Sequence, residues 1–241
     1  MRYAIFSDIH GNLEALQAVL LAYQADKIDK YICLGDIVGY GADPRKCIAR
    51  LSELGSVNLA GNHDWAVVDK FDSSFFNSNA LEAILWTMKQ VNAREKQFLK
   101  NLALTYSDRY ISCAHGTLFR PEKFSYMYSL SVAADSFRCI EKKICFIGHT
   151  HIPMFFKQSG GQIKAYAGKS VRLEDDAEYI FNIGSVGQPR DGIPEAAYGI
   201  YDTKKRLVEI KRISYNISKA QSKIRKAGIA EYLAQRLGQG R

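Results

Sequence analysis

The sequence lacks the features that mark membrane-spanning and exported proteins. No segment approaches the roughly 18 consecutive apolar residues that a membrane-crossing helix needs. The short apolar run at the N-terminus is interrupted at Asp8, which is too early for a signal peptide. We therefore expect a cytoplasmic protein without a membrane partner. The five cysteines are odd in number and form no CxxC pair, which argues against a disulfide framework and a zinc–thiolate site. We expect them to be reduced and largely buried.

Excess basic charge is absent from most of the chain. Residues 204–241 hold 11 Lys and Arg against 2 Asp and Glu, whereas the preceding 203 residues hold 22 against 23. The net charge of +8 therefore belongs to the tail and does not indicate a nucleic-acid-binding body. Lys219, Lys223 and Lys226 share one face of the expected tail helix. Such a face is usually solvated, and contact with a nucleic acid or another subunit is the alternative.

The sequence also has no repeats, low-complexity segments or convincing linkers. Its 241 residues, of which 47% are hydrophobic, can bury a substantial core. We expect one main domain over residues 1–215. We expect residues 216–241 to form a basic C-terminal helix packed on the same domain.

Strands and helices alternate in the first 60 residues. Apolar runs predict strands at 3–6, 31–34 and 57–60, and helical spacing predicts helices at 13–23 and 44–54 between them. Asn12 and Pro44 suit the starts of these helices, as a capping residue and a first-turn proline. This order favours parallel strands in a layered α/β fold.

The rest of the chain predicts more strands than helices. Residues 65–108 look mostly helical, most clearly at 80–90 and 93–102. They are followed by a strand at 110–114, a loop at 117–128, a helix at 130–140 and a strand at 144–147. Further strands are predicted at 155–157, 163–166, 179–183, 197–201 and 207–213. The segment 217–237 reads as a single amphipathic helix.

All five histidines lie in short motifs that come directly after predicted strands. The motifs are Asp8-Ile9-His10, Gly61-Asn62-His63-Asp64, Ala114-His115-Gly116 and Gly148-His149-Thr150-His151, and Gly35-Asp36-Ile37-Val38-Gly39 adds a carboxylate. A single histidine at a strand end is more often a core or surface residue than a ligand. Their joint placement favours a metal site, because ligands usually gather at the carboxyl ends of parallel strands.

Seven side chains are then available to bind metal. They are Asp8, His10, Asp36, Asn62, His115, His149 and His151. Mixed nitrogen and oxygen ligands without a thiolate suit Mn²⁺, Fe or Zn²⁺. Seven groups are too many for one tetrahedral ion, but they fit two divalent metal ions if one carboxylate bridges them.

The ordered series DxH, GDxxG, GNHD, GH and GHTH resembles the calcineurin-like metallophosphoesterase superfamily, and most closely its short bacterial phosphodiesterase branch. The motifs span residues 8–151, and the glycine-rich segment 182–190 resembles a later loop of that branch, so the resemblance extends to about Asp202. It implies a sandwich of two mixed β-sheets flanked by helices, in four layers.

The resemblance also implies roles for the motif residues. One ion would be bound by Asp8, His10, Asp36 and His151, and the other by Asp36, Asn62, His115 and His149, with Asp36 bridging. A metal-bridging hydroxide would attack phosphorus, because two cations neutralise the ester and create the nucleophile. His63 would be the catalytic acid with Asp64 behind it. From the chemistry alone, His63 could equally be a ligand, with Asn62 only capping a turn.

The substrate is expected to be a small phosphodiester or nucleotide-like molecule. Arg190 could grip a phosphate, or could pair with Asp191 or Glu195 in a surface turn. The loop 119–128 could use Arg120 and its aromatic residues to bind a substrate base, or could bury those aromatics in the core. A non-catalytic interaction protein on the same fold and a nuclease remain the alternative functions.

Overall fold

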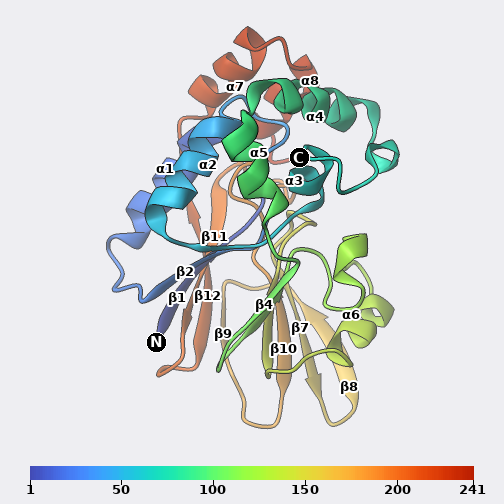
Figure 1. Cartoon of the computed structure of the whole chain (residues 1–241). Coiled ribbons are helices and arrows are strands. Elements are labelled where there is room, and N and C mark those ends of the chain that lie inside the picture. Colours follow the sequence, from blue (N-terminus) through green and yellow to red (C-terminus); the bar gives the residue numbers. More distant parts are fainter.

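The computed structural model describes all 241 residues as two six-stranded sheets packed face to face (Figure 1). The strands are β1 (Arg2–Phe6), β2 (Lys30–Cys33), β3 (Val57–Asn58), β4 (Thr105–Ser107), β5 (Ser112–Ala114), β6 (Ile144–Ile147), β7 (Met154–Ser159), β8 (Gln162–Tyr166), β9 (Ser170–Arg172), β10 (Glu178–Asn182), β11 (Ala196–Asp202) and β12 (Leu207–Ile213). Their orders are β3-β2-β1-β11-β12-β9 and β4-β5-β6-β10-β7-β8. The predicted pair of mixed sheets is confirmed.

Each sheet contains three neighbouring parallel strands. In the first sheet β1, β2 and β3 are parallel, with Ile5 opposite Ile32. In the second, β5, β6 and β10 are parallel, with Phe146 opposite Phe181. Hydrogen bonds between backbone groups join the loops that follow these strands, such as Val186 N–H to the Ser7 carbonyl. The carboxyl ends of both parallel sets therefore meet at one end of the sandwich.

The helices cover the outer faces and one end of the sandwich. They are α1 (Leu13–Tyr23), α2 (Pro44–Leu54), α3 (Asn62–Ala66), α4 (Ser78–Gln90), α5 (Ala93–Lys100), α6 (Leu130–Phe137), α7 (Ile217–Lys226) and α8 (Glu231–Gln235), with 3-10 turns at Ser73–Phe75, Pro121–Lys123 and Arg236–Gly238. Figure 1 shows α1 and α2 beside the first sheet, α6 beside the second, and α4, α7 and α8 together at the upper end. None combines the length and the apolar character that crossing a bilayer requires.

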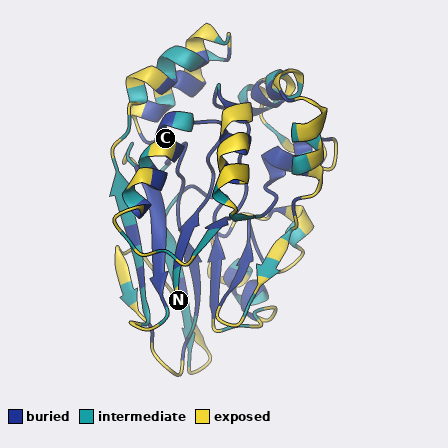
Figure 2. Ribbon diagram, turned by 60° about the vertical axis from the view of Figure 1, so that its left-hand side comes forward, coloured by how far each residue is buried: buried dark blue, intermediate teal, exposed yellow.

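Alternation along β1 sends its side chains into two cores. Ala4 and Phe6 pack in the cluster that includes residues of α1 and α2, whereas Tyr3 and Ile5 pack with residues of the second sheet such as Phe181. Figure 2 shows the central strands buried and the outer surfaces of the helices exposed. Burying each large apolar side chain contributes about 1.5–3 kcal/mol. The two cores therefore give the strand-end loops a rigid base.

The prediction that the cysteines are largely buried is confirmed. Cys33, Cys47, Cys113 and Cys145 are buried, Cys139 is exposed, and none forms a disulfide.

The prediction of one helix over 217–237 is wrong. The chain turns at Gly228, whose φ of +70° lies in the left-handed region that favours glycine. The segment is therefore a helical hairpin, in which Ala220 and Ile224 of α7 pack with Leu233 and Leu237. Helical periodicity alone could not reveal the break, because both arms have apolar residues at helical spacing.

The short strands β4 and β9 were not predicted either, and β4 falls inside the region expected to be mostly helical. β4 pairs with β5 and β9 pairs with β12, both antiparallel. Each has three residues that are exposed or only partly buried. Such short edge strands leave no apolar run to read in the sequence.

The lysine face of α7 is not simply solvated, as its spacing had suggested. Nζ of Lys223 lies 2.6 Å from Glu14 Oε1 and 2.5 Å from Asp43 Oδ2. Lys219 Nζ lies 3.4 Å from the same Glu14 oxygen. Both carboxylates belong to residues that are buried. These contacts tie α7 to the start of α1 and to the residue that precedes α2.

Candidate active site

The loops after the parallel strands bring the candidate ligands together, and five of the seven have unusual backbone conformations. Ten non-glycine residues have positive φ, and five of them are candidate ligands. The five are Asp8 (55°), His10 (49°), Asp36 (52°), His149 (67°) and His151 (62°). Positive φ is uncommon for such residues and clusters at functional sites, where the surrounding structure enforces it.

The first group of candidate ligands consists of Asp8, His10, Asp36 and His151, all buried, with potential ligand atoms within 4.8 Å of one another. The Nε2 atoms of His10 and His151 are 3.0 Å apart. Nε2 of His151 lies 3.3 Å from Asp8 Oδ1. This group joins the loops after β1, β2 and β6.

The second group consists of Asp36, His115 and His149, also buried and equally close. His115 Nε2 lies 3.1 Å from His149 Nδ1. Asn62 begins α3 between Gly61 and His63, both of which contact Asp36. It is 6% exposed, and its side-chain oxygen has no hydrogen-bond partner. An unpartnered buried amide oxygen costs free energy unless another group, such as a cation, satisfies it.

Asp36 belongs to both groups through a single oxygen. Its Oδ2 lies 3.5 Å from Nε2 of His10 and 3.3 Å from Nε2 of His115. The other oxygen, Oδ1, accepts a hydrogen bond of 2.9 Å from the backbone N–H of His63. This hydrogen bond fixes the carboxylate with Oδ2 directed between the two groups.

These distances fit divalent cations. Two nitrogens bound at right angles to one ion, each about 2.1 Å from it, are separated by about 3.0 Å. That is close to the separations found in the pairs His10–His151 and His115–His149. The ligand atoms are nitrogen and oxygen without sulfur, which suits Mn²⁺, Fe and Zn²⁺. Both groups therefore have the ligand atoms and the spacing that suit a divalent cation, and they share Asp36.

Backbone carbonyls orient three of the four candidate histidine ligands. The Nδ1 atoms of His10, His115 and His151 donate to the carbonyl oxygens of Val38, Leu34 and Gln188, at 3.1, 3.0 and 2.6 Å. Each hydrogen bond leaves Nε2 with its lone pair directed to the group, as is usual for metal-binding histidines. His149 differs, because it faces the group with Nδ1 and its Nε2 has no partner.

Two buried carboxylates in the site, those of Asp8 and Asp36, are ionised. Burial alone would raise the pKa of Asp8, but His151 nearby lowers it well below its usual range. Burial likewise opposes ionisation of Asp36, and His115 nearby lowers its pKa strongly. Burial lowers the pKa of His10, whereas the Asp36 carboxylate overcomes burial and raises the pKa of His115 to about 9. Two ionised carboxylates among mostly neutral imidazoles attract cations.

His63 lies beside the ligand groups and belongs to neither. It is 3% exposed, and its ring centroid lies 4.8 Å from that of His10 and 4.5 Å from that of Tyr40. Phe76 packs edge-on against its other side. Burial lowers the pKa of His63 to about 4, so its imidazole is neutral at pH 7. A neutral ring next to the ligands can donate one N–H to a bound molecule.

Asp64 holds two of the strand-end loops together. Its buried carboxylate accepts hydrogen bonds from the backbone N–H groups of Ile37, Val38 and Gly61, at 2.9, 3.1 and 3.0 Å. Burial and the neighbouring charge of Asp36 raise the pKa of Asp64 to about 7. Its contacts are those of a residue that positions the loop carrying Asp36.

Arg190 points toward the site and has no acidic partner. Its Nε and one terminal nitrogen donate to the side-chain oxygen of Gln188 at 3.3 and 2.8 Å, and its guanidinium lies 5.8 Å from the ring centre of Tyr40. The two acids considered for it are engaged elsewhere: Asp191 pairs with Arg212, and Glu195 accepts from Ser214. The alternative of a surface ion pair is therefore wrong.

The loop 117–128 divides its aromatic residues between the core and the surface. Phe124 and Met127 are buried, whereas Phe119, Tyr126 and Tyr128 are exposed. Arg120 is also exposed, with its guanidinium 5.2 Å from the ring centre of Phe119, and it makes no hydrogen bond or ion pair with the candidate site. Its contact with a substrate stays a prediction.

Tyr40 and Gln188 were not singled out in the sequence. Tyr40 packs between His10, His63 and Arg190, and Gln188 contacts both His151 and Arg190. Tyr40 immediately follows the Gly35–Gly39 motif and Gln188 lies in the glycine-rich segment, so proximity to motifs was the available signal.

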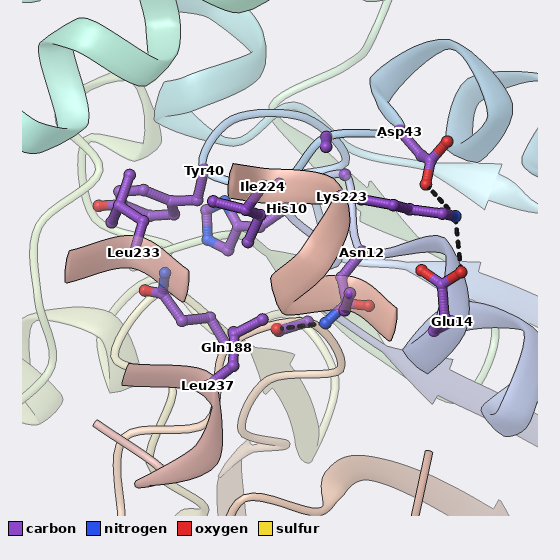
Figure 3. Close-up of a pocket in the computed structure, with 15 residues that line it drawn as sticks. His10, Asn12, Glu14, Tyr40, Asp43, Gln188, Lys223, Ile224, Leu233 and Leu237 are labelled. Atoms are coloured by element: carbon purple, nitrogen blue, oxygen red, sulfur yellow. Dashed lines mark hydrogen bonds and ion pairs between the residues drawn. The ribbon is translucent and has the colours of Figure 1, made fainter. Parts of the chain in front are cut away.

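The C-terminal hairpin closes the side of the site next to His10. Ile224 and Leu233 line a narrow cavity together with His10, Tyr40 and Gln188 (Figure 3). Its volume of about 10 Å³ is just enough for one water molecule. A substrate must therefore approach the ligands from another side.

Comparisons with known proteins agree with this geometry. Residues 1–206 match the family model of the calcineurin-like phosphoesterase superfamily domain. The uncharacterized protein MJ0912 of Methanocaldococcus jannaschii is 40% identical, over 99% of this chain and 98% of its own length. The phosphodiesterase YfcE of Escherichia coli is 27% identical, over 84% of this chain and 88% of its own length. The crystal structure of a metallophosphoesterase from Sphaerobacter thermophilus has a TM-score of 0.89 and 36% identity, covering 100% of this chain and 99% of that one. The chain therefore belongs to the calcineurin-like phosphoesterase superfamily and is a phosphoesterase.

Proposed function

We propose that this phosphoesterase uses two divalent cations to hydrolyse a phosphodiester or nucleotide-like substrate, with His63 acting on the leaving group. The observation that carries the proposal is the position of Asp36, whose Oδ2 lies within 3.5 Å of one histidine from each ligand group. The name of the Escherichia coli relative, a phosphodiesterase, supports a diester substrate.

Each proposed ion has its own set of ligands. Asp8, His10, Asp36 and His151 would hold one ion, and Asp36, Asn62, His115 and His149 would hold the other, with manganese, iron and zinc as the candidates. When bound, the cations supply positive charge that neutralises the phosphate and activates water as the nucleophile.

The remaining residues handle the substrate. His63 can donate an N–H hydrogen bond to the leaving oxygen, and complete proton transfer requires that the anionic substrate raise the pKa of His63 on binding. Arg190 has free N–H groups and no acidic partner, so it is placed to hold a phosphate oxygen. Asp64 holds the loops that carry Asp36 and His63 in a fixed position relative to each other, because it accepts hydrogen bonds from the backbone of both.

The test is hydrolysis of bis-p-nitrophenyl phosphate by protein that is stripped with a chelator and reloaded with Mn²⁺. We expect His63→Ala to lower kcat by about 10²–10⁴-fold while metal content stays unchanged. Full turnover in that variant would remove His63 from this role.

The two alternative functions give different outcomes. Bound ions without hydrolysis of any phosphoester would favour the non-catalytic interaction protein. A nuclease is less favoured, because Lys223 on the basic tail is already paired with Glu14 and Asp43.

A further inference from the structure

The side of the site next to His149 carries exposed tyrosines on a firmly anchored loop. Phe124 and Met127 are 3% and 2% exposed and fix the loop to the core. The loop also folds tightly over Gly116, where an added Cβ would lie 2.8 Å from the carbonyl oxygen of Ser125. Because these anchors hold the loop, the outward direction of Tyr126 and Tyr128 is a property of the fold.

Tyr126, Tyr128 and His149 form a stack of nearly parallel rings. The ring of Tyr126 lies 3.8 Å from that of His149, centre to centre, at an angle of 19°. Tyr128 continues the stack at 5.4 Å and 7°. Since parallel rings in contact are about 3.5 Å apart, the longer separation means that Tyr128 is displaced sideways. Part of the outer face of Tyr126 therefore stays uncovered.

The stack is open to solvent and has few other interactions. Tyr126 is 46% exposed and Tyr128 is 59% exposed, and neither hydroxyl makes a hydrogen bond within the chain. Isolated exposed aromatics need no explanation. Two that stack on each other and on a candidate metal ligand make a flat apolar surface next to the reacting centre.

The position of the stack suits the organic part of a substrate. The opposite side, next to His10, is closed by the C-terminal hairpin and has room for only one water. A phosphate held by Arg190 and the ligand groups would thus place its ester group over Tyr126 and Tyr128.

We propose that Tyr126 and Tyr128 form a stacking platform for the nucleobase of a nucleotide substrate. This inference rests on the proposed function, which places the phosphate at the ligand groups. In a nucleotide, one sugar separates the base from the phosphate. The platform begins at Tyr126, whose ring stacks directly on that of the candidate ligand His149. Stacking on aromatic rings tolerates every base, so the platform selects for a base and does not read its identity.

The test compares two phosphate monoesters that differ only in the base. Calorimetry with Mn²⁺-loaded protein measures the binding of AMP and of ribose 5-phosphate. We expect AMP to bind at least about tenfold more tightly. Tyr128→Ala should lower the affinity for AMP toward that for ribose 5-phosphate, and Tyr128→Phe should retain it. Tyr166→Ala removes another exposed tyrosine, which lies on β8 and is 39% exposed, and serves as the control.

Equal affinities for the two ligands, or a preference for AMP that survives in Tyr128→Ala, would overturn the platform. Phenyl phosphate binding as tightly as AMP would overturn its assignment to a nucleobase. If the protein hydrolyses bis-p-nitrophenyl phosphate but binds AMP no better than ribose 5-phosphate, the proposed function stands and the platform is overturned. If it prefers AMP through Tyr128 but hydrolyses no ester, the platform stands and the proposed function is overturned.

Discussion

Replacing Asp36 by asparagine removes a negative charge from the point where the two ligand groups meet. Asparagine preserves the shape of the side chain and can still accept the 2.9 Å hydrogen bond from the backbone of His63. Its NH₂ group, however, cannot bind a cation where Oδ2 now lies. The first group would retain the carboxylate of Asp8, whereas the second would retain only neutral Asn62 and two histidines.

We therefore expect Asp36→Asn to weaken the ion of the second group by at least about 100-fold, or roughly 2.7 kcal/mol, and the ion of the first group by less. Metal analysis after gel filtration should give about two Mn²⁺ per chain in the original protein, fewer than one in Asp36→Asn, and about one in Asp8→Asn. Loss of both ions in Asp8→Asn combined with retention of both in Asp36→Asn would refute a bridging Asp36.

Three further outcomes follow from contacts described above. Lys223→Ala removes the cation that two buried carboxylates share and leaves Asp43 with Lys46 and Glu14 with the more distant Lys219, so it should lower the free energy of unfolding by about 1–3 kcal/mol in urea denaturation, whereas the exposed Lys219→Ala should change it by less than about 0.5 kcal/mol. Burial opposes ionisation of Asp43, but Lys223 lowers the pKa of this carboxyl group. The difference in stability between the two variants should therefore be complete above the ordinary pKa of Asp, and it should vanish as the pH falls through the lowered pKa of Asp43. Arg190→Ala should raise KM for a phosphodiester with unchanged metal content, and Arg190→Lys should not restore it fully, because lysine cannot donate to two acceptors in one plane. Mn²⁺ at 100 times its Kd should stabilise the chain by about 2.7 kcal/mol per ion in thermal unfolding, an increase that a chelator abolishes; equal melting with and without the chelator would show that no ion binds.

The local pattern of apolar residues was enough to predict the main strands and helices of this protein. Apolar runs located the long strands, and α1 begins and ends where helical spacing placed it, at Leu13 and Tyr23. The candidate ligands could be grouped because each follows a strand, and parallel strands deliver their carboxyl ends to one place.

The features that sequence could not supply depend on contacts between distant segments. Whether Phe124 is buried and Tyr126 exposed is decided by packing against residues far along the chain, such as Trp65 and His149. The short edge strands and the break at Gly228 likewise have no distinct hydrophobic period. That Arg190 has no acidic partner depends on a contact between distant segments, in which Asp191 pairs with Arg212.

The left-handed backbone at five candidate ligand positions has a consequence for the stability of the chain. A non-glycine residue in this conformation costs about 1 kcal/mol relative to glycine. Replacing His149 or His151 by glycine or by alanine removes the same buried ring, and in the ion-free chain the glycine variant should be the more stable of the two by about that amount. The difference between the two variants therefore measures the cost of the backbone conformation separately from the loss of the ligand. The ligand loops are in this sense held by the surrounding structure against the preference of their own backbone.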